Sequence, residues 1–304
     1  YLSATINRED NMLIKTISRK IFDNFIYVIF FILITVIFIF PMIYVLGNSF
    51  RNTQAIWSNA YPFTLKSFFT FKDFTLSGYL YSLGLTDTAR LQSVNITRNL
   101  MISLLSSLAV VGISMLVSTA AAYFFARLPF PRKNILLVLV VATMMIPQQV
   151  VTVPLYFVAN SLRLINTFWA LVVPWYSSPF VVFLLIQFIS DIPYELDEAA
   201  IVDGATRFQI LWRVVLPNCV PGLLTVGLME FQFIWNEYFW PLVSINSTKL
   251  QPIQVAIAAQ FTDRAQNWGA VFATMVLASL PIILLFLFAQ RYFYESVTSS
   301  GIKG

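Results

Sequence analysis

Long stretches without a charged side chain make up most of this sequence, and they constrain the fold more than any other feature. Residues 24–50 form the first stretch, and four more follow at 99–126, 134–162, 164–190 and 265–290. A sixth region, 219–243, is apolar apart from Glu230 and Glu237. Because a helix needs about 20 apolar residues to cross a bilayer, the pattern predicts an all-α membrane protein with six transmembrane helices.

The composition supports lipid as the solvent and excludes several kinds of site. Hydrophobic residues make up 58% of the chain and charged residues only 11%, which is untypical of a water-soluble domain. The absence of His and the single Cys219 exclude a His-based metal site, a Ser-His-Asp triad and an intrachain disulfide. The sequence also lacks a phosphate-binding Gly-x-x-x-x-Gly-Lys-Ser/Thr motif. We therefore expect no metal, cofactor or covalent chemistry on this chain, and an ATPase on another chain if ATP drives transport.

The apolar stretches divide the chain into five parts. We expect residues 1–24 to be a polar amino-terminal segment and residues 25–47 to be the first span. Residues 48–98 form a long polar connection, which could be a small folded cap or a loose loop. The other five spans lie within 99–290, and residues 291–304 form a tail.

The basic residues predict how the chain is oriented. The short loop 127–133 carries three of them, whereas the next short loop, 159–166, carries one. Short cytoplasmic loops are enriched in Lys and Arg, so we place the first of these loops inside. Both termini and the segment 191–217 are then cytoplasmic, and the 48–98 connection is extracellular. The net charge of +5 fits this orientation better than nucleic-acid binding, and we expect no nucleic-acid partner.

Two of the predicted spans carry paired prolines, Pro147 with Pro154 and Pro174 with Pro179. Proline removes a backbone donor and tends to kink a helix. A single proline is common in membrane helices, but two in one span favour helices that bend around a pathway.

Residues 191–217 form a polar segment between two apolar regions, with the sequence DIPYELDEAAIVDGATRFQILWRVVLP. Pro193 suits a first helical turn, and the acidic residues behind it suit the positive end of the helix dipole. Gly204 then interrupts, Thr206 can cap a second helix, and Leu216-Pro217 is expected to end it. The segment is predicted to form two short helices with a bend, on one side of the membrane. Its charges alone would also suit an ordinary solvated loop.

The spacing within this segment resembles the EAA loop of ABC importer permeases. That loop has Glu-Ala-Ala, three residues, Gly, nine residues and Ile-x-Leu-Pro, and here only Val214 replaces the Ile. Small side chains suit a helix that lies closely against a partner surface. The resemblance implies that residues 191–217, hereafter the EAA loop, couple to an ATPase subunit. The coupling residues would be Glu198, Ala199, Ala200, Asp203, Gly204, Leu216 and Pro217.

The fifth span, expected from Pro221 to about Leu242, contains two carboxylates. Glu230 would lie near the bilayer midplane, and Glu237 about 10 Å further out. These two acids share one helix face, whereas Gln232 and Asn236 share nearly the opposite face. A carboxylate inside a membrane normally faces a water-filled cavity or a partner group because its burial is costly. Glu230 could therefore line a substrate pathway, pair with a neighbouring helix, or be protonated.

Aromatic side chains lie beside these polar groups along the span. Sugar sites commonly combine aromatic surfaces with groups that can bond hydroxyls. Trp240 is expected instead to anchor the outer end of the span at the lipid–water interface. The residues alone leave the solute open. The candidate pathway residues are Glu230, Gln232, Phe233, Trp235, Asn236 and Glu237.

Four stretches resemble the carbohydrate importer permeases of the maltose type, namely MMIPQQVVTVPLYF (144–157), SLRLINTFWALVVP (161–174), IPYELDEAAIVDGA (192–205) and IWNEYFWPL (234–242). The resemblance covers residues 95–304, and its tail, SSGIKG, would reach into the ATPase interface. It implies a type I ABC importer permease fold in a bacterial cell membrane, for sugars or oligosaccharides. The implied partners are a second homologous permease subunit, two cytoplasmic ATPase subunits and an extracellular solute-binding protein.

Two other functions stay open at this point. The EAA loop is shared across importers, so a permease for amino acids, peptides or another small solute is possible, although the stretches 144–157 and 234–242 favour sugars. A secondary transporter driven by an ion gradient could use Glu230 as its ion site. A membrane enzyme is disfavoured, because nothing near the two carboxylates resembles a nucleophile or a metal site.

Overall fold

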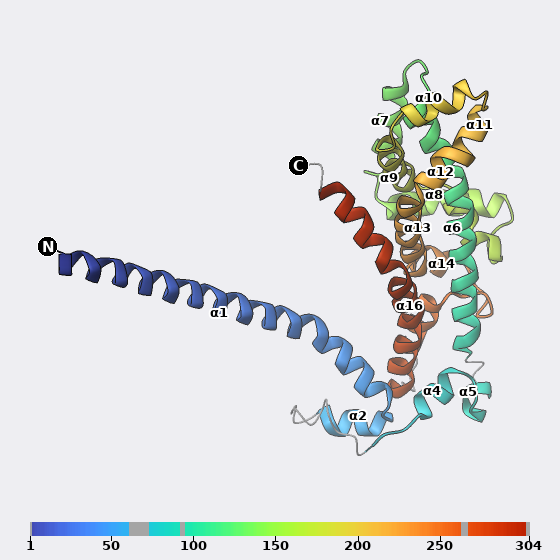
Figure 1. Cartoon of the computed structure of the whole chain (residues 1–304). Helices are drawn as coiled ribbons and strands as arrows, with labels where there is room; N and C mark the ends of the chain where they lie inside the picture. Colours follow the sequence, from blue (N-terminus) through green and yellow to red (C-terminus); the bar gives the residue numbers. More distant parts are fainter. Residues whose placement is uncertain (1, 61–72, 92–94, 263–266, 302–304) are drawn as a thin grey trace.

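The chain is described by a computed structural model that places residues 2–60, 73–91, 95–262 and 267–301 (Figure 1). Among these residues every regular element is a helix. Three helical stretches are long and apolar enough to cross a membrane: Ile26–Ser49 within α1 (Leu2–Ser49), α6 (Ile96–Arg127), and Trp268–Gln290 within α16 (Trp268–Gly301). Helix α16 continues through the predicted tail as far as Gly301, and residues 302–304 lie outside the described part.

Three more spans are each broken into two helical pieces. The pieces of the second span meet at 95°, those of the third at 47° and those of the fourth at 81°. Counted as one span each, these pairs bring the total to six, as the apolar stretches predicted. The pairs are α7 (Lys133–Thr143) with α8 (Gln148–Ser161), η1 (Phe168–Leu171) and η2 (Val173–Trp175) with α9 (Pro179–Ser190), and residues 207–218 with α13 (Val220–Trp235).

Proline positions explain two of the breaks. Pro147 is the residue that precedes α8, and Pro179 is the first residue of α9. Proline is well placed at the start of a helix, where its missing N–H leaves no partner unsatisfied. The bends predicted from the paired prolines are therefore confirmed, although Pro154 lies inside α8 without ending it.

Helix α6 is the central helix of the bundle. It packs against α9 and α13, while α13 in turn packs against α16. One apolar cluster, which includes Ala122, Leu185 and Ile210, joins the carboxyl end of α6 to α9 and the EAA loop. A second cluster, around Ile96 and Trp235, joins the other end of α6 to α13 and to α15 (Ile253–Thr262). The EAA loop and the outer ends of α9 and α13 consequently lie at opposite ends of one packed core.

Helix α1 differs from the other spans because most of it leaves the bundle. Figure 1 shows it extending away from the remaining helices, with only its carboxyl end beside α16. There Tyr44 packs edge-on against Phe272, with ring centroids 5.8 Å apart. From Ile26 to Leu46 its apolar side chains are mostly exposed. Such a surface suits lipid or a second membrane helix.

The connection between α1 and α6 contains a folded cap rather than a loose loop. We define the cap as α2 (Thr53–Ala60), α4 (Ser77–Ser82) and α5 (Asp87–Leu91). Helices α2 and α4 both pack against α16. The sequence left a cap and a loose loop open, and the described residues form the cap.

The contact between the cap and α16 is close enough to require glycine. A Cβ atom on Gly78 would lie 2.5 Å from the carbonyl oxygen of Gly269, and a Cβ atom on Gly269 would overlap the carbonyl oxygen of Arg51. Beside them the buried Ser82 hydroxyl donates to the Ala270 carbonyl oxygen at 3.1 Å. Backbone therefore packs directly on backbone at this end of α16.

Candidate functional site

The EAA loop folds into two short helices with a bend, as predicted. Helix α10 (Glu195–Val202) has three acidic residues in its first turn, and a second helix begins with α11 (Arg207–Ile210). Between them Gly204 adopts a φ of +81°, a conformation that residues with a Cβ rarely take. Gly204 is therefore the backbone element that sets the angle between the two helices.

Thr206 caps the second helix, as predicted, through a reciprocal pair of hydrogen bonds. The Gln209 N–H donates to the Thr206 hydroxyl oxygen at 3.3 Å, and the Thr206 N–H donates to the Gln209 side-chain oxygen at 2.7 Å. This capping box satisfies two backbone donors that a helix start would otherwise leave unpaired.

The prediction that Leu216-Pro217 ends the second helix is wrong. The helix continues from α11 through a π-helical turn, η3 (Leu211–Val215), into α12 (Leu216–Asn218). Pro217 lies in the first turn of α12, where proline is tolerated. The chain changes direction only at Cys219, where it enters α13 at 81° to the preceding helix.

The EAA loop has a buried side and an exposed side. Its buried side chains, Ile192, Ile210, Leu211 and Val215, belong to the apolar cluster with α6 and α9. On the other side, four of the seven predicted coupling residues lie together near the bend, where a partner could reach them. Of the seven, Glu198, Ala199, Asp203, Gly204 and Pro217 are exposed, and Ala200 and Leu216 are half-buried.

The fifth span is shorter than predicted. Helix α13 ends at Trp235, and a new helix, α14 (Phe239–Ser244), begins after a turn. Asn236 and Glu237 therefore lie in this turn and not on the helix, so their expected assignment to opposite helix faces is wrong. Pro241 could have indicated the break, because it cannot donate to the Glu237 carbonyl and its ring would clash with it in a continuous helix.

The break brings five of the six candidate pathway residues into one cavity of about 570 Å³. We call it the polar cavity. It lies at the ends of α9 and α13 that are farther from the EAA loop, since both helices have their other ends at that loop. Its lining consists of Ser178, Phe180, Met229, Glu230, Gln232, Phe233, Asn236 and Glu237.

The two carboxylates of the polar cavity have different environments. Glu230 is 5% exposed, and its carboxylate accepts a hydrogen bond from the Ser114 hydroxyl of α6 at 3.2 Å. Glu237 accepts from the Trp240 backbone N–H at 2.9 Å and from the Gln148 side-chain amide at 3.4 Å. Glu230 thus links α13 to α6, and Glu237 links the turn after α13 to α8.

Two tryptophans are placed differently from their predicted positions. Trp235 does not line the polar cavity, because it is 1% exposed and its indole N–H donates to the Ala278 carbonyl of α16 at 3.2 Å. The prediction that Trp240 is an interface anchor is wrong. Its ring is fully buried and donates to the Ala170 carbonyl at 2.8 Å. Both rings use their single polar atom inside the core, as buried tryptophans usually do.

Sequence reasoning missed the contribution of other helices to the cavity. Ser178 and Phe180 come from the start of α9, and Ser114 and Gln148 come from α6 and α8. These residues lie 50 or more positions away from Glu230 in the sequence. Ser178 also caps α9, with its hydroxyl accepting from the Val181 N–H at 3.4 Å. No local pattern connects them to the fifth span.

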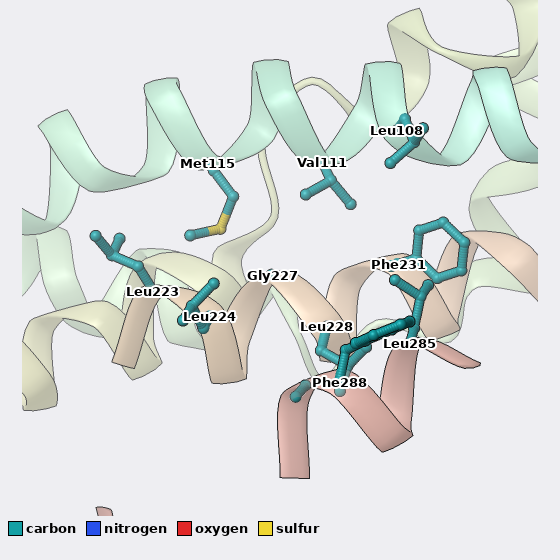
Figure 2. Close-up of a pocket in the computed structure, with 11 residues that line it drawn as sticks. Leu108, Val111, Met115, Leu223, Leu224, Gly227, Leu228, Phe231, Leu285 and Phe288 are labelled. Atoms are coloured by element: carbon teal, nitrogen blue, oxygen red, sulfur yellow. The ribbon is translucent and has the colours of Figure 1, made fainter. Parts of the chain in front are cut away.

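A second cavity, of about 390 Å³, differs in chemistry from the polar one. Figure 2 shows side chains of α6 and α13, including Val111, Met115 and Leu224, facing each other across it, with Leu285 and Phe288 of α16 at one end. Every side chain in its lining is apolar. It therefore offers nothing that could bond the hydroxyls of a polar solute.

Comparison with known proteins yields consistent matches. The family described as “Binding-protein-dependent transport system inner membrane component” matches residues 114–299. The probable ABC transporter permease protein YurM of Bacillus subtilis is 38% identical over 195 residues, which are 63% of this chain and 65% of that protein. The arabinooligosaccharides transport system permease protein AraQ of Halalkalibacterium halodurans is 30% identical over 277 residues, covering 90% of this chain and 94% of that protein.

A solved structure has the same fold. It is the crystal structure of a bacterial ABC transporter involved in the import of the acidic polysaccharide alginate. The match has a TM-score of 0.77 at 21% identity and covers 91% of this chain and 98% of the other.

Proposed function

The chain belongs to the family of binding-protein-dependent transport system inner membrane components, and from this premise we propose that it is a permease subunit of an ATP-driven importer of sugars or oligosaccharides. It is a multi-pass membrane protein. Membership of this family disfavours the ion-driven carrier and the membrane enzyme considered from the sequence. The chain would form half of a translocation pathway, and a second homologous permease would form the other half.

The observation that carries the sugar assignment is the polar cavity. Gln232 and Asn236 are exposed beside the two carboxylates, and the half-exposed ring of Phe233 lies edge-on to Trp175 at 5.5 Å. Amide and carboxylate groups can bond hydroxyls, and an aromatic face can pack against the C–H surface of a sugar ring. A named relative, AraQ, transports arabinooligosaccharides, which supports the same class of solute.

The EAA loop is the proposed contact with one of two cytoplasmic ATPase subunits. Its exposed side offers Glu198, Ala199 and Asp203 around the bend at Gly204, and the bulky side chain of Val202 beside them is 87% exposed. An exposed apolar side chain between acidic residues suits a protein partner better than water. Both chain termini would lie on this cytoplasmic side, and the cap and an extracellular solute-binding protein on the other.

The mechanism would be alternating access. Closure of the ATPase pair on ATP would move the EAA loop, and the packed core of α6, α9 and α13 would carry this movement to the polar cavity. The cavity would then open outward and receive solute from the binding protein, and hydrolysis would reset it. For this to work the EAA loop must bind the closed and open ATPase pairs with different affinity, because equal affinity shifts no equilibrium.

Purification from the native membrane in a gentle detergent tests this proposal directly. Mass spectrometry of the co-purified chains should recover an ATPase and a second permease, and a co-purified binding protein would identify the solute. Recovery of this chain alone, or only with copies of itself, would contradict the proposal. Uptake into vesicles that contain the complex should depend on ATP and not on an ion gradient.

The role of Glu230 is tested by Glu230→Gln. The amide keeps the size of the side chain and can still accept from Ser114, so we expect the complex to assemble normally. Solute uptake should fall by about tenfold, in the range expected when one charged contact of a binding site is lost. Glu237→Gln is the matched control for a carboxylate at the edge of the same cavity. Unchanged uptake in Glu230→Gln would leave Glu230 only a structural contact between α13 and α6.

A further inference from the structure

A buried ion pair joins the EAA loop to the end of α6. The Arg127 Nε atom lies 3.5 Å from a carboxylate oxygen of Asp197, and the two side chains are 6% and 0% exposed. Neither residue belongs to the predicted coupling set or to the polar cavity. Neither Asp197 oxygen accepts a hydrogen bond from the described residues, so charge is the main attraction between the two groups.

Arg127 holds the EAA loop at two further points. Its guanidinium donates to the Ile192 carbonyl oxygen at 2.6 Å, and it lies over the ring of Tyr194 at 5.6 Å from the centroid. Arg127 is the last residue of α6, and Asp197 lies in the first turn of α10. A cation at a helix carboxyl end and an anion at a helix amino end both oppose the local helix dipole favourably. The contact therefore fixes the end of one helix to the start of the other.

Burial makes this contact selective. Two ions removed from water are stable only while they stay together, because either one alone would be a buried uncompensated charge. A contact of this kind resists separation of α10 from α6 more strongly than an exposed ion pair or an apolar contact of the same size would. Movement of α10 should therefore take the end of α6 with it.

The same helix reaches the polar cavity. Ser114 lies 13 residues before Arg127 on α6, about 20 Å along a helix, and its hydroxyl donates to Glu230. Described residues from Ile96 to Arg127 form one helix without a break, unlike the three bent spans. An unbroken helix transmits a displacement at one end to the other.

We propose that Arg127 and Asp197 are positioning residues that couple the ATPase-driven movement of the EAA loop to α6 and, through Ser114, to the polar cavity. This inference rests on the proposed function, since it requires an ATPase that moves the EAA loop. It adds a pair of residues outside the exposed coupling surface, on the far side of α10 from the ATPase.

The test measures movement at the cavity and not the amount of complex. Met229 lines the polar cavity and is 44% exposed. In a Cys219→Ala background, Met229→Cys provides a single reporter on this chain for a membrane-impermeant maleimide. The labelling rate is compared in vesicles of the assembled complex without nucleotide and with ATP plus vanadate. Because the rate is measured per reporter, a variant that only lowers assembly does not change it.

Asp197→Asn should abolish the response to nucleotide. It keeps the shape of the side chain but leaves Arg127 unpaired, and the ratio of the two labelling rates should fall by about tenfold, as expected for the loss of a typical coupling between two sites. Glu195→Gln, an exposed acid in the same turn of α10, is the matched control and should keep the full ratio. Arg127→Lys should give an intermediate ratio, because one ammonium cannot reproduce the planar guanidinium contacts.

Different failures are distinguishable. If the unsubstituted reporter shows no response to nucleotide, or no ATPase co-purifies, the proposed function itself fails. If Asp197→Asn keeps the full ratio while the reporter responds, only this inference is overturned. Should Asp197→Asn fail to assemble, the double variant R127M/D197L removes both charges, and such apolar pairs are often tolerated. It should assemble without a response, and a full response in it would overturn the inference.

Discussion

The EAA loop and the cap both connect spans through short helices, yet they are attached to the core by different means. The cap is held by direct contact between backbones at Gly78, Gly269 and Arg51. The EAA loop is held by an apolar base and by one buried ion pair, Arg127 with Asp197, and most of its opposite side is exposed. The comparison teaches that one connection is built to stay in place at its end of the bundle, whereas the other can move as a unit on a single strong attachment.

The largest expected effect lies in the cap. Gly269→Ala should lower the free energy of unfolding by about 3 kcal/mol, because the added methyl group overlaps backbone that has little room to shift. Thermal unfolding of the purified protein measures this. Gly112→Ala is the matched control, since a Cβ atom there would meet nothing within 4 Å. Equal melting temperatures for the two variants would show that the cap is not rigidly packed.

A glycine substitution in the EAA loop should act on transport instead of stability. Gly204→Val forces a branched side chain into a conformation that costs about 1–2 kcal/mol, although a Cβ atom there has free space. The protein should reach the membrane in normal amounts, while uptake should fall by about tenfold as the two helices lose their angle. Gly204→Asn, which tolerates this conformation better, should retain most of the uptake. Uptake at the normal rate in Gly204→Val would rule out a coupling role for the bend.

Ser82→Ala sharpens the comparison on the side of the cap. It removes the buried hydrogen bonds between the Ser82 hydroxyl and Ala270 and Thr274 of α16. We expect a loss of about 1 kcal/mol in unfolding free energy and no change in uptake per folded molecule. Thermal unfolding and vesicle uptake together test this, with Ser58→Ala as a control for a part-buried serine on α2 that bonds only within its own helix. Reduced uptake per folded molecule would show that the cap takes part in transport.

The smallest effect is expected at the start of the second EAA helix. Thr206→Ala removes the capping box and should destabilise this helix locally by about 1 kcal/mol. Uptake should fall only about twofold, and global unfolding should not change measurably. Thr206→Ser keeps the hydroxyl and should behave like the unsubstituted protein. A loss of uptake as large as that of Gly204→Val would mean that helix formation, and not the angle at Gly204, controls the EAA loop.

The sequence was most informative where the relevant residues follow one another. Uncharged length was enough to predict six spans, and Gly204 and Thr206 predicted the bend and the cap of the second EAA helix. The polar cavity was only partly predictable, because helical periodicity no longer applies beyond Trp235, where α13 ends. The burial of Trp235 and Trp240 depends on acceptors in α16 and η1 that no local pattern places beside them. For the same reason the partnership of Arg127 with Asp197 needed the fold.

The π-helical turn at Leu211–Val215 has a consequence for how this region can vary in length. Such a turn contains one residue more than an α-helical turn, so η3 sets the rotational register between the EAA loop and the fifth span. Deleting one residue there would allow an ordinary α-helix, but it would rotate everything after it by about 100° around the helix axis. Glu230 would then no longer face Ser114. The nine-residue interval between Gly204 and Val214 is thus a phase relation between two functional surfaces, and insertions that most loops absorb would be harmful in this one.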